Sequence, residues 1–285
     1  MEFEHKTIKT NGIRLHIVQA GPESGPPVVL LHGFPEFWYG WRKQIPALVK
    51  AGCRVIVPDQ RGYNLSDKPK GIKSYCIDAL VEDVVGLINA LKYEKVNLVG
   101  HDWGALVGWM LAIKYPEKLH RLGILNVPHP AVMKRFLQRD PDQMRRSLYA
   151  LFFQLPWLPE LSMWVGNWVG ASLGMHRSGR GHAFTHEDIV KYKEAWSQPG
   201  AITAMLNWYR AAPRYRSQIT NGMQVHIPTL IVWGVKDFAL SYRMARPSLD
   251  YCDEGNLIFF PDASHWVQHE EADEVNRHLL NFISS

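Results

Sequence analysis

The segment Gly100-His101-Asp102-Trp103-Gly104 constrains this 285-residue chain more than any other. It directly follows the apolar run 96–99, which predicts a buried strand, and precedes 105–114, which predicts a helix. The pattern has the form of a nucleophile elbow, a strained strand-to-helix turn that exposes its central residue. That residue is usually serine, but here it is Asp102. We therefore expect a carboxylate nucleophile at the end of a strand.

A carboxylate at this position changes the chemistry that the turn supports. Serine attacks acyl carbons well, but on a saturated carbon it would leave an ether that water does not readily cleave. A carboxylate attacking the same carbon leaves an ester, which an activated water can hydrolyse. Asp102 therefore indicates nucleophilic substitution at a saturated carbon, by epoxide opening or carbon–halogen cleavage.

The rest of the chain predicts an α/β architecture. Strand and helix patterns alternate through the first half, beginning with a hairpin around Asn11-Gly12 and including a helix over 38–50. This alternation predicts a mostly parallel twisted sheet flanked by helices. Only helical patterns occur over 128–216, before the alternation resumes. We expect a core domain of residues 1–127 and 217–285, with an inserted all-helical cap over 128–216.

Two helix starts are predicted inside the cap. Thr185-His186-Glu187-Asp188 predicts a capped helix start, and Pro199 suits the first turn of the next helix. The cap segment 148–175 is rich in Leu, Phe, Trp and Val, but Pro156, Pro159 and Glu160 interrupt it. It lacks the run of ~20 apolar residues that a membrane span needs. We expect no stable membrane insertion, and a lid over an apolar pocket explains the composition.

Asp102 needs a base that activates water and a group that orients this base. His265 follows the last predicted strand, and Asp237 follows the strand before it. The chain order nucleophile, acid, histidine is typical of hydrolases with this elbow, and open sheets place their sites at the carboxyl ends of strands. A metal site built from His182 and His186 is the alternative, but it lacks a strict H-E-x-x-H pattern.

The turn His32-Gly33-Phe34-Pro35 follows the predicted strand 28–31 and indicates an oxyanion hole. Such a hole needs backbone N–H groups that point into the site. We expect these donors to be the N–H groups of Phe34 and Trp103, with His32 in support, and we predict a cis Phe34–Pro35 peptide bond.

These motifs resemble those of the epoxide hydrolases of the α/β-hydrolase fold, over essentially the whole chain. The matching segments are 32–36, 59–63, 100–104 and the loops that carry Asp237 and His265. Tyr149, in 147–154, and Tyr209, in 206–210, match the two ring-opening tyrosines of that family. Tyrosine, with a reference pKa of ~10, stays protonated at neutral pH and can donate a proton to the opening ring. Tyr192 and Tyr215 are interpreted as packing residues.

The resemblance also implies roles for other groups. Glu36 matches a position that in some members helps to hold the hydrolytic water, and a solvent-facing loop carboxylate is the alternative. No metal or organic cofactor is required. The expected substrates are a small apolar epoxide and water. The cap residues Phe152, Phe153, Trp157, Trp164 and Trp168 suggest an apolar pocket, although several of them are expected in the cap core.

Three other functions compete with this one. A haloalkane dehalogenase would use the Trp103 indole for halide, but it often has an asparagine where this chain has Phe34. Some haloalkane dehalogenases carry their acid after the strand that precedes the cap, where the nearest polar residue here is the uncharged Asn126. A fluoroacetate (haloacid) dehalogenase would carry an arginine at the position of Trp103. A non-catalytic ligand-binding protein of the same fold need not retain all five of Asp102, Asp237, His265, Tyr149 and Tyr209.

Composition limits the partners and the compartment. The net charge of +5 raises the question of nucleic acid, but the one basic cluster, 134–146, also contains acidic residues, and no nucleic-acid motif occurs. We expect no nucleic-acid partner, and a monomer or homodimer. The three cysteines have no paired spacing, and the charged start lacks the apolar stretch of a secretory signal. These features predict a cytoplasmic protein.

Overall fold

The computed structural model describes residues 2–181, 183–217, 219 and 222–285. Its centre is an eight-stranded sheet with the strand order β1-β2-β4-β3-β5-β6-β7-β8. The strands are β1 (Glu4–Thr10), β2 (Ile13–Ala20), β3 (Pro27–Leu31), β4 (Arg54–Pro58), β5 (Val96–His101), β6 (Leu119–Leu125), β7 (Thr229–Gly234) and β8 (Gly255–Phe260). The pairs β1–β2 and β2–β4 are antiparallel, and all other neighbours are parallel. The predicted fold class is confirmed.

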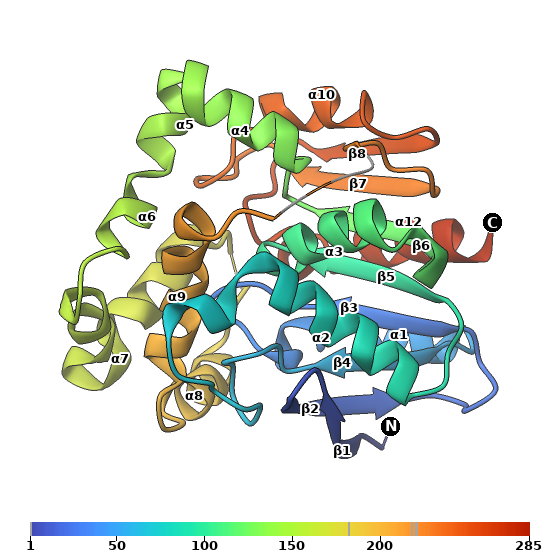
Figure 1. Ribbon diagram of the computed structural model, residues 1–285, viewed down its shortest axis with the longest axis horizontal. Coiled ribbons are helices and arrows are strands. Elements are labelled where there is room, and N and C mark those ends of the chain that lie inside the picture. Colours follow the sequence, from blue (N-terminus) through green and yellow to red (C-terminus); the bar gives the residue numbers. More distant parts are fainter. Residues whose placement is uncertain (1, 182, 218, 220–221) are drawn as a thin grey trace.

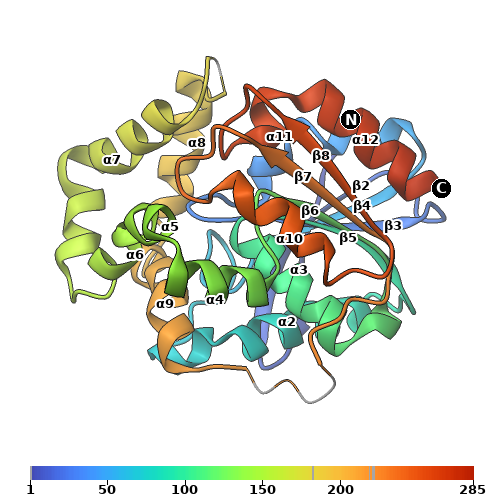
Figure 2. The ribbon, with the colours of Figure 1, turned by 90° about the horizontal axis from the view of Figure 1, so that it is seen from above.

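Helices cover both faces of the sheet, as Figure 2 shows. The core helices are α1 (Ile45–Lys50), α2 (Ile77–Ala90), α3 (Trp103–Lys114), α10 (Ala245–Leu249), α11 (Val267–Glu270) and α12 (Ala272–Ser284). Short 3₁₀ segments cover Trp38–Trp41, Ile72–Tyr75, Pro116–Lys118 and Tyr242–Met244. Helices α2, α3 and α10 bury residues such as Trp109 on one face, and α1 and α12 bury Leu48 and Leu279 on the other. Strands covered on both faces are buried along their whole length, as β4, β5 and β7 are.

Two local predictions need correction. The expected helix over 38–50 is instead a 3₁₀ turn followed by the separate helix α1. Pro46 lies in the first turn of α1, where its missing N–H is tolerated but cannot continue an earlier helix. Pro199 precedes α9 instead of starting it. Gly200 caps that helix with a φ of 78°, a left-handed conformation that glycine adopts without strain.

The described residues between β6 and β7 form six helices, gathered at one end of the sheet (Figure 1). They are α4 (Pro130–Arg139), α5 (Pro141–Arg146), α6 (Leu148–Phe152), α7 (Leu158–Ser178), α8 (His186–Trp196) and α9 (Ala201–Arg214). Thr185 and Asp188 form the predicted capping box of α8. Helix α7 is broken inside, at Val165–Trp168. None of the helices in the described part of the chain is long and apolar enough to cross a bilayer.

Candidate active site

The parallel strands end beneath the cap, and each brings one polar group to the same edge of the sheet. Asp102 follows β5 and is the N-cap of α3, with a φ of 50° that places it in the left-handed region. Such a conformation is strained for a residue with a side chain and persists only where the surrounding structure imposes it. Part of that constraint is close packing, because a Cβ on Gly104 would lie 2.2 Å from the carbonyl oxygen of Leu31. The turn therefore has the geometry expected of the elbow.

The structure brings Asp102, His265 and Asp237 together. Nε2 of His265 lies 3.5 Å from Oδ2 of Asp102, and Nδ1 of His265 lies 2.8 Å from Oδ2 of Asp237. His265 and Asp237 are buried, whereas the Asp102 side chain keeps a small exposed area. The imidazole thus lies between two carboxylates, one on each ring nitrogen.

This arrangement controls the charges of the three groups. Burial disfavours the imidazolium, but the charge of Asp237, the ion pair with Asp102 and the hydrogen bond to Asp237 outweigh it and raise the pKa of His265 to about 10. Burial likewise opposes ionisation of Asp102, but His265 and the Phe34 N–H lower the pKa of this carboxyl. At neutral pH the site therefore holds an Asp102 carboxylate beside a His265 imidazolium.

Asn126 holds Asp237 in place, which the sequence reasoning missed. Its Nδ2 donates to Oδ2 of Asp237 at 2.7 Å, and its Oδ1 accepts from the backbone N–H of Gly234 at 3.0 Å. The other Asp237 oxygen accepts from the N–H groups of Ala239 and Leu240. Asn126 is the first residue after the predicted strand 119–125, so its position at a strand end was the available indication.

The oxyanion-hole candidates lie against the same carboxylate. The backbone N–H of Phe34 donates to Oδ1 of Asp102 at 2.7 Å. Trp103 opens α3, where the first N–H groups have no partner inside the helix. Gly33 permits this approach, since a Cβ there would lie 2.2 Å from Cβ of Asp102. The predicted cis Phe34–Pro35 bond is confirmed.

His32 is fully buried and acts on the shape of this turn. Its Nδ1 donates to the carbonyl oxygen of Gly33 at 3.0 Å, and its Nε2 accepts from the backbone N–H of Gln60 at 3.0 Å. The side chain of Gln60 in turn donates to the carbonyl oxygen of His32. Gln60, which follows the neighbouring strand β4, therefore holds the turn at 32–35 in place through these hydrogen bonds.

Glu36 is buried, so the alternative of a solvent-facing carboxylate is wrong. The loop folds back beneath the cap, and Tyr192 and His269 each donate to Oε1 of Glu36 at 2.7 Å. Burial opposes the charge, but His269 and His101 hold the pKa of Glu36 well below its ordinary value. His101 connects this cluster to the site, because its Nε2 donates to the carbonyl oxygen of His265 at 2.8 Å.

Tyr149 on α6 and Tyr209 on α9 face each other, with ring centroids 5.9 Å apart. Tyr209 lies directly over the oxyanion-hole candidates, with its ring 4.9 Å from Trp103 and 5.2 Å from Phe34. Burial and the negative charge of Asp102 raise the pKa values of both tyrosines. Both phenols are therefore protonated at neutral pH.

The neighbours of Tyr209 anchor it to the core, and sequence reasoning did not identify them. The indole Nε1 of Trp208 donates to the carbonyl oxygen of Arg61 at 2.9 Å, and Gln154 donates to the carbonyl oxygen of Tyr209 at 2.9 Å. Arg61 forms a buried ion pair with Asp83. A hydrogen-bonded path therefore links the cap tyrosine to helix α2 of the core.

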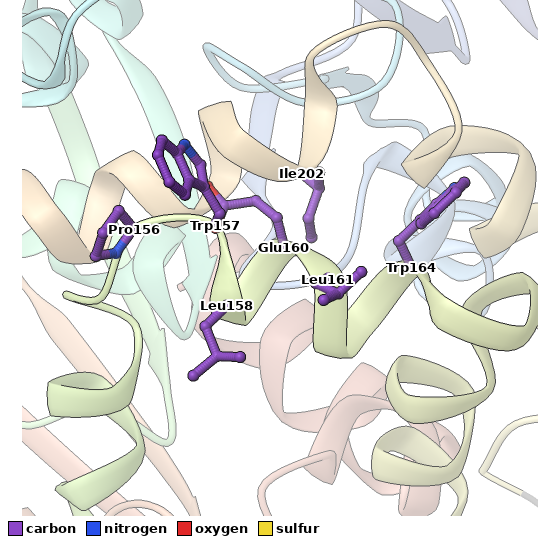
Figure 3. A pocket seen from close by; sticks show the side chains of 7 residues that line it. All are labelled: Pro156, Trp157, Leu158, Glu160, Leu161, Trp164 and Ile202. Carbon is purple, nitrogen blue, oxygen red and sulfur yellow. The ribbon is translucent and has the colours of Figure 1, made fainter.

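The cap aromatics divide into different environments. Phe153 packs between the two tyrosines, and Trp168 is buried against Trp196 inside the cap. Trp157 and Trp164 instead line an outer groove of about 520 Å³ between α7 and α9. The groove residues are Pro156, Trp157, Leu158, Glu160, Leu161, Trp164 and Ile202 (Figure 3). The expected lid explains only part of the apolar segment, since much of it faces outward.

The structure also locates the other two cap tyrosines that the sequence analysis considered. Tyr192 is buried in the cap, as expected of a packing residue. Tyr215, at the end of α9, is exposed, so its interpretation as a packing residue is wrong. His182, which the metal alternative would need, lies outside the described residues.

Comparisons with known proteins identify the family of the chain. The family described as the alpha/beta hydrolase fold matches residues 26–272. The AB hydrolase superfamily protein YfhM of Bacillus subtilis strain 168 is 49% identical over 278 residues, which cover 98% of this chain and 97% of that protein. Human epoxide hydrolase 4 is 36% identical over 288 residues, covering 97% and 77%. A crystal structure of Bacillus megaterium epoxide hydrolase with an inhibitor superposes with a TM-score of 0.90 at 32% identity, covering 98% and 100%. The chain therefore belongs to the α/β-hydrolase family and, within it, to the epoxide hydrolases.

Proposed function

We propose that this protein hydrolyses small apolar epoxides to 1,2-diols through a covalent ester on Asp102. One observation carries the proposal. The elbow carboxylate lies between a histidine–aspartate pair and a backbone N–H donor on the core side, while the cap contributes two protonated tyrosines. Phe34 and Phe153 flank Tyr209 and give the site apolar walls that suit an apolar substrate.

The first half-reaction forms the ester. Asp102, held ionised by His265 and Phe34, attacks one epoxide carbon, and the bond between that carbon and the ring oxygen breaks. The alkoxide that develops takes a proton from Tyr149 or Tyr209. Proton transfer during the attack avoids a free alkoxide. General acid catalysis of this kind typically accelerates a reaction by about 10²–10⁴-fold.

The second half-reaction hydrolyses the ester. Esterification removes the charge of Asp102, so one of the two carboxylates that stabilise the His265 imidazolium disappears. The pKa of His265 then falls, and its proton passes by way of solvent to the tyrosinate that ring opening left. The neutral imidazole can then accept a proton from water. Hydroxide adds to the side-chain carbonyl carbon of Asp102, and the bond to the diol oxygen breaks. Asp237, positioned by Asn126, stabilises the imidazolium that forms.

Backbone donors stabilise the tetrahedral intermediate of that step. The Phe34 N–H already donates to Oδ1 of Asp102 in the free protein, and the Trp103 N–H opens α3 beside it. Negative charge that develops on this oxygen therefore meets donors that need no reorganisation. Glu36 does not touch the reacting groups directly. It contacts His101, which in turn donates to the carbonyl oxygen of His265 and so helps to position this base.

Turnover of styrene oxide tests the proposal. Purified protein is expected to form phenylethanediol, and Asp102→Ala is expected to form none while still folding. The same preparations are assayed for halide release from 1-bromobutane and fluoroacetate. Halide release without diol formation would instead establish a dehalogenase. Saturable binding of epoxides without conversion of any would establish a ligand-binding protein.

A further inference from the structure

The outer surface of the cap is unusually apolar. Eleven of the eighteen exposed large hydrophobic side chains in the described residues lie between 148 and 173. Trp157 is 83% exposed, Leu151 66% and Trp164 62%. We call the exposed apolar side chains of 148–173 the cap edge. Both ribbon views place α6 and α7, which carry it, on the side of the molecule away from the strands (Figures 1 and 2).

The cap edge is also almost free of charge. Between 147 and 175 the only Asp, Glu, Lys or Arg is Glu160. Its carboxylate is neutralised by Arg210, whose Nη1 and Nη2 lie 2.7 and 3.0 Å from its two oxygens. A solvated surface helix normally carries charged residues on its outer face. The composition of this surface is instead that of a face covered by an apolar medium.

Basic side chains border the cap edge at both ends of the sequence. Arg139 and Arg145 precede it, Arg177 and Arg180 follow it, and all four are exposed. Arg145 is paired with Asp142 and Arg180 with Glu271, so Arg139 and Arg177 contribute most of the uncompensated charge. The predicted cap, residues 128–216, holds twelve Lys and Arg against six Asp and Glu, whereas the rest of the chain holds 20 against 21. The positive net charge of the protein therefore resides in the cap.

Trp157 and Trp164 are exposed on the outside of the cap. Trp157 has a φ of 61°, and the break in α7 at Gly166 and Asn167 places these residues in the left-handed region as well. Figure 3 shows Trp157 and Trp164 at opposite ends of the outer groove, with Ile202 of α9 between them. The groove leaves both indoles accessible from outside the cap.

Apolar patches of this extent are typical of interaction surfaces. Two copies of the protein that met through the cap edge would bring their basic borders together, and this repulsion disfavours a dimer. An anionic bilayer satisfies both features, because its interface accommodates tryptophan and leucine while its headgroups attract arginine. We propose that the cap edge binds peripherally and reversibly to anionic lipid bilayers.

This binding would act on substrate access. Tyr149 is 36% exposed and so belongs to the cap edge, and it contacts Tyr209 of the candidate active site. An apolar epoxide dissolved in the bilayer would therefore meet the cap next to the proton donors, a consequence that rests on the proposed function. The binding itself does not rest on it and is measured without turnover.

Vesicle co-sedimentation tests the proposal with the complete protein. Wild type is expected to bind vesicles of phosphatidylcholine and phosphatidylglycerol at 3:1 at least about tenfold better than pure phosphatidylcholine vesicles. Raising NaCl from 0.05 to 0.5 M is expected to remove most of this preference, because salt screens the arginines. Brominated lipids are expected to quench the tryptophan fluorescence of the bound wild type.

Two double variants separate the apolar and the basic contributions. Trp157→Ser with Trp164→Ser is expected to lose at least about tenfold in binding to the 3:1 vesicles. Arg145→Gln with Arg177→Gln is expected to lose the preference for anionic vesicles. Leu65→Ser is the matched control, since Leu65 is 56% exposed but lies in the core domain, and it should bind as wild type does. Circular dichroism melting verifies that each variant is folded.

Three outcomes would overturn the proposal. The first is wild-type protein that shows no preference for anionic vesicles. This measurement uses no variant, so it tests the proposal even if a variant unfolds. Another is equal binding by wild type and the tryptophan variant. The third is a dimer in sedimentation velocity that Trp157→Ser with Trp164→Ser abolishes, because a second copy would then be what covers the cap edge.

Discussion

Nε2 of His265 lies 3.5 Å from Oδ2 of Asp102, close enough for a strong ionic interaction but longer than a tight hydrogen bond. The two side chains therefore form an ion pair in the free protein, and this ion pair is lost during turnover. Asp102 leaves the pair when it becomes an ester, and His265 then loses the charge that had kept it protonated. The remaining partner, Asp237, keeps the imidazole oriented throughout.

Replacement of His265 should separate the two half-reactions. His265→Gln retains a polar group of similar size but cannot accept a proton from water. We expect turnover of styrene oxide to fall by at least about 10³-fold while an adduct of one substrate mass accumulates on Asp102. Intact-protein mass spectrometry measures the adduct, and Asp102→Asn provides the control without one. Loss of activity with no adduct at any time would argue that His265 serves the first step instead.

The two cap tyrosines should act on ring opening. Tyr149→Phe or Tyr209→Phe removes one phenolic donor but preserves the ring contacts around Phe153. We expect each to lower kcat/KM for styrene oxide by about 10²–10⁴-fold through a slower ester-forming step in stopped flow. Tyr215→Phe is the matched control, because Tyr215 is exposed to the same extent as Tyr149 and has no place in the site. Equal rates of ester formation in Tyr149→Phe, Tyr209→Phe and the Tyr215→Phe control would show that the two cap tyrosines do not donate the proton.

Asn126 should act only through Asp237. Asn126→Ala removes the 2.7 Å hydrogen bond to the Asp237 carboxylate, a charged interaction worth about 1.5–3 kcal/mol. We expect kcat to fall by about 10- to 100-fold, and the acidic limb of the kcat profile to move to lower pH, because a displaced Asp237 stabilises the His265 imidazolium less. Asn126→Asp should be more harmful, because a second carboxylate would face Asp237. A decrease in activity without movement of the acidic limb would indicate a general packing defect.

The His265 ion pairs should also appear in the pH dependence of stability. Because the folded pKa of His265 is raised to about 10 from an ordinary 6.5, its stabilising contribution is complete below pH 6.5 and disappears as the pH rises towards 10. The difference in unfolding free energy between wild type and His265→Gln should therefore shrink over this interval, on the order of a few kcal/mol. Urea unfolding at pH 6, 8 and 10 measures it. A difference that stays constant over this range would contradict the ion-pair assignment.

Much of this protein could be predicted from local patterns in the sequence. The hairpin at Asn11-Gly12, the parallel strands and the capped start of α8 depend on residues near one another in the chain, and the structure contains each of them. Asp102, Asp237 and His265 were placed together because strand ends of a parallel sheet meet at one edge.

What could not be predicted depends on contacts between distant residues. Nothing local shows that Glu36 turns inward to meet His269 and Tyr192, since these partners are more than 150 positions away. Asn126 and Asp237 are 111 positions apart, and only the place of Asn126 at a strand end pointed to their contact. The outward position of Trp157 could not be predicted either, since Trp168 in the same segment is buried. The composition of an apolar segment does not show whether its side chains face a pocket or the outside of the protein.

The most direct test of the covalent mechanism is a single turnover of styrene oxide with excess enzyme in H₂¹⁸O, followed by mass analysis of the peptide that contains Asp102. Water that attacks the ester carbonyl leaves its oxygen on the carboxylate, whereas the diol departs with an oxygen from Asp102. The covalent mechanism predicts ¹⁸O in the Asp102 peptide and an unlabelled diol. A labelled diol with unlabelled Asp102 would show direct attack of water on the epoxide and would contradict it.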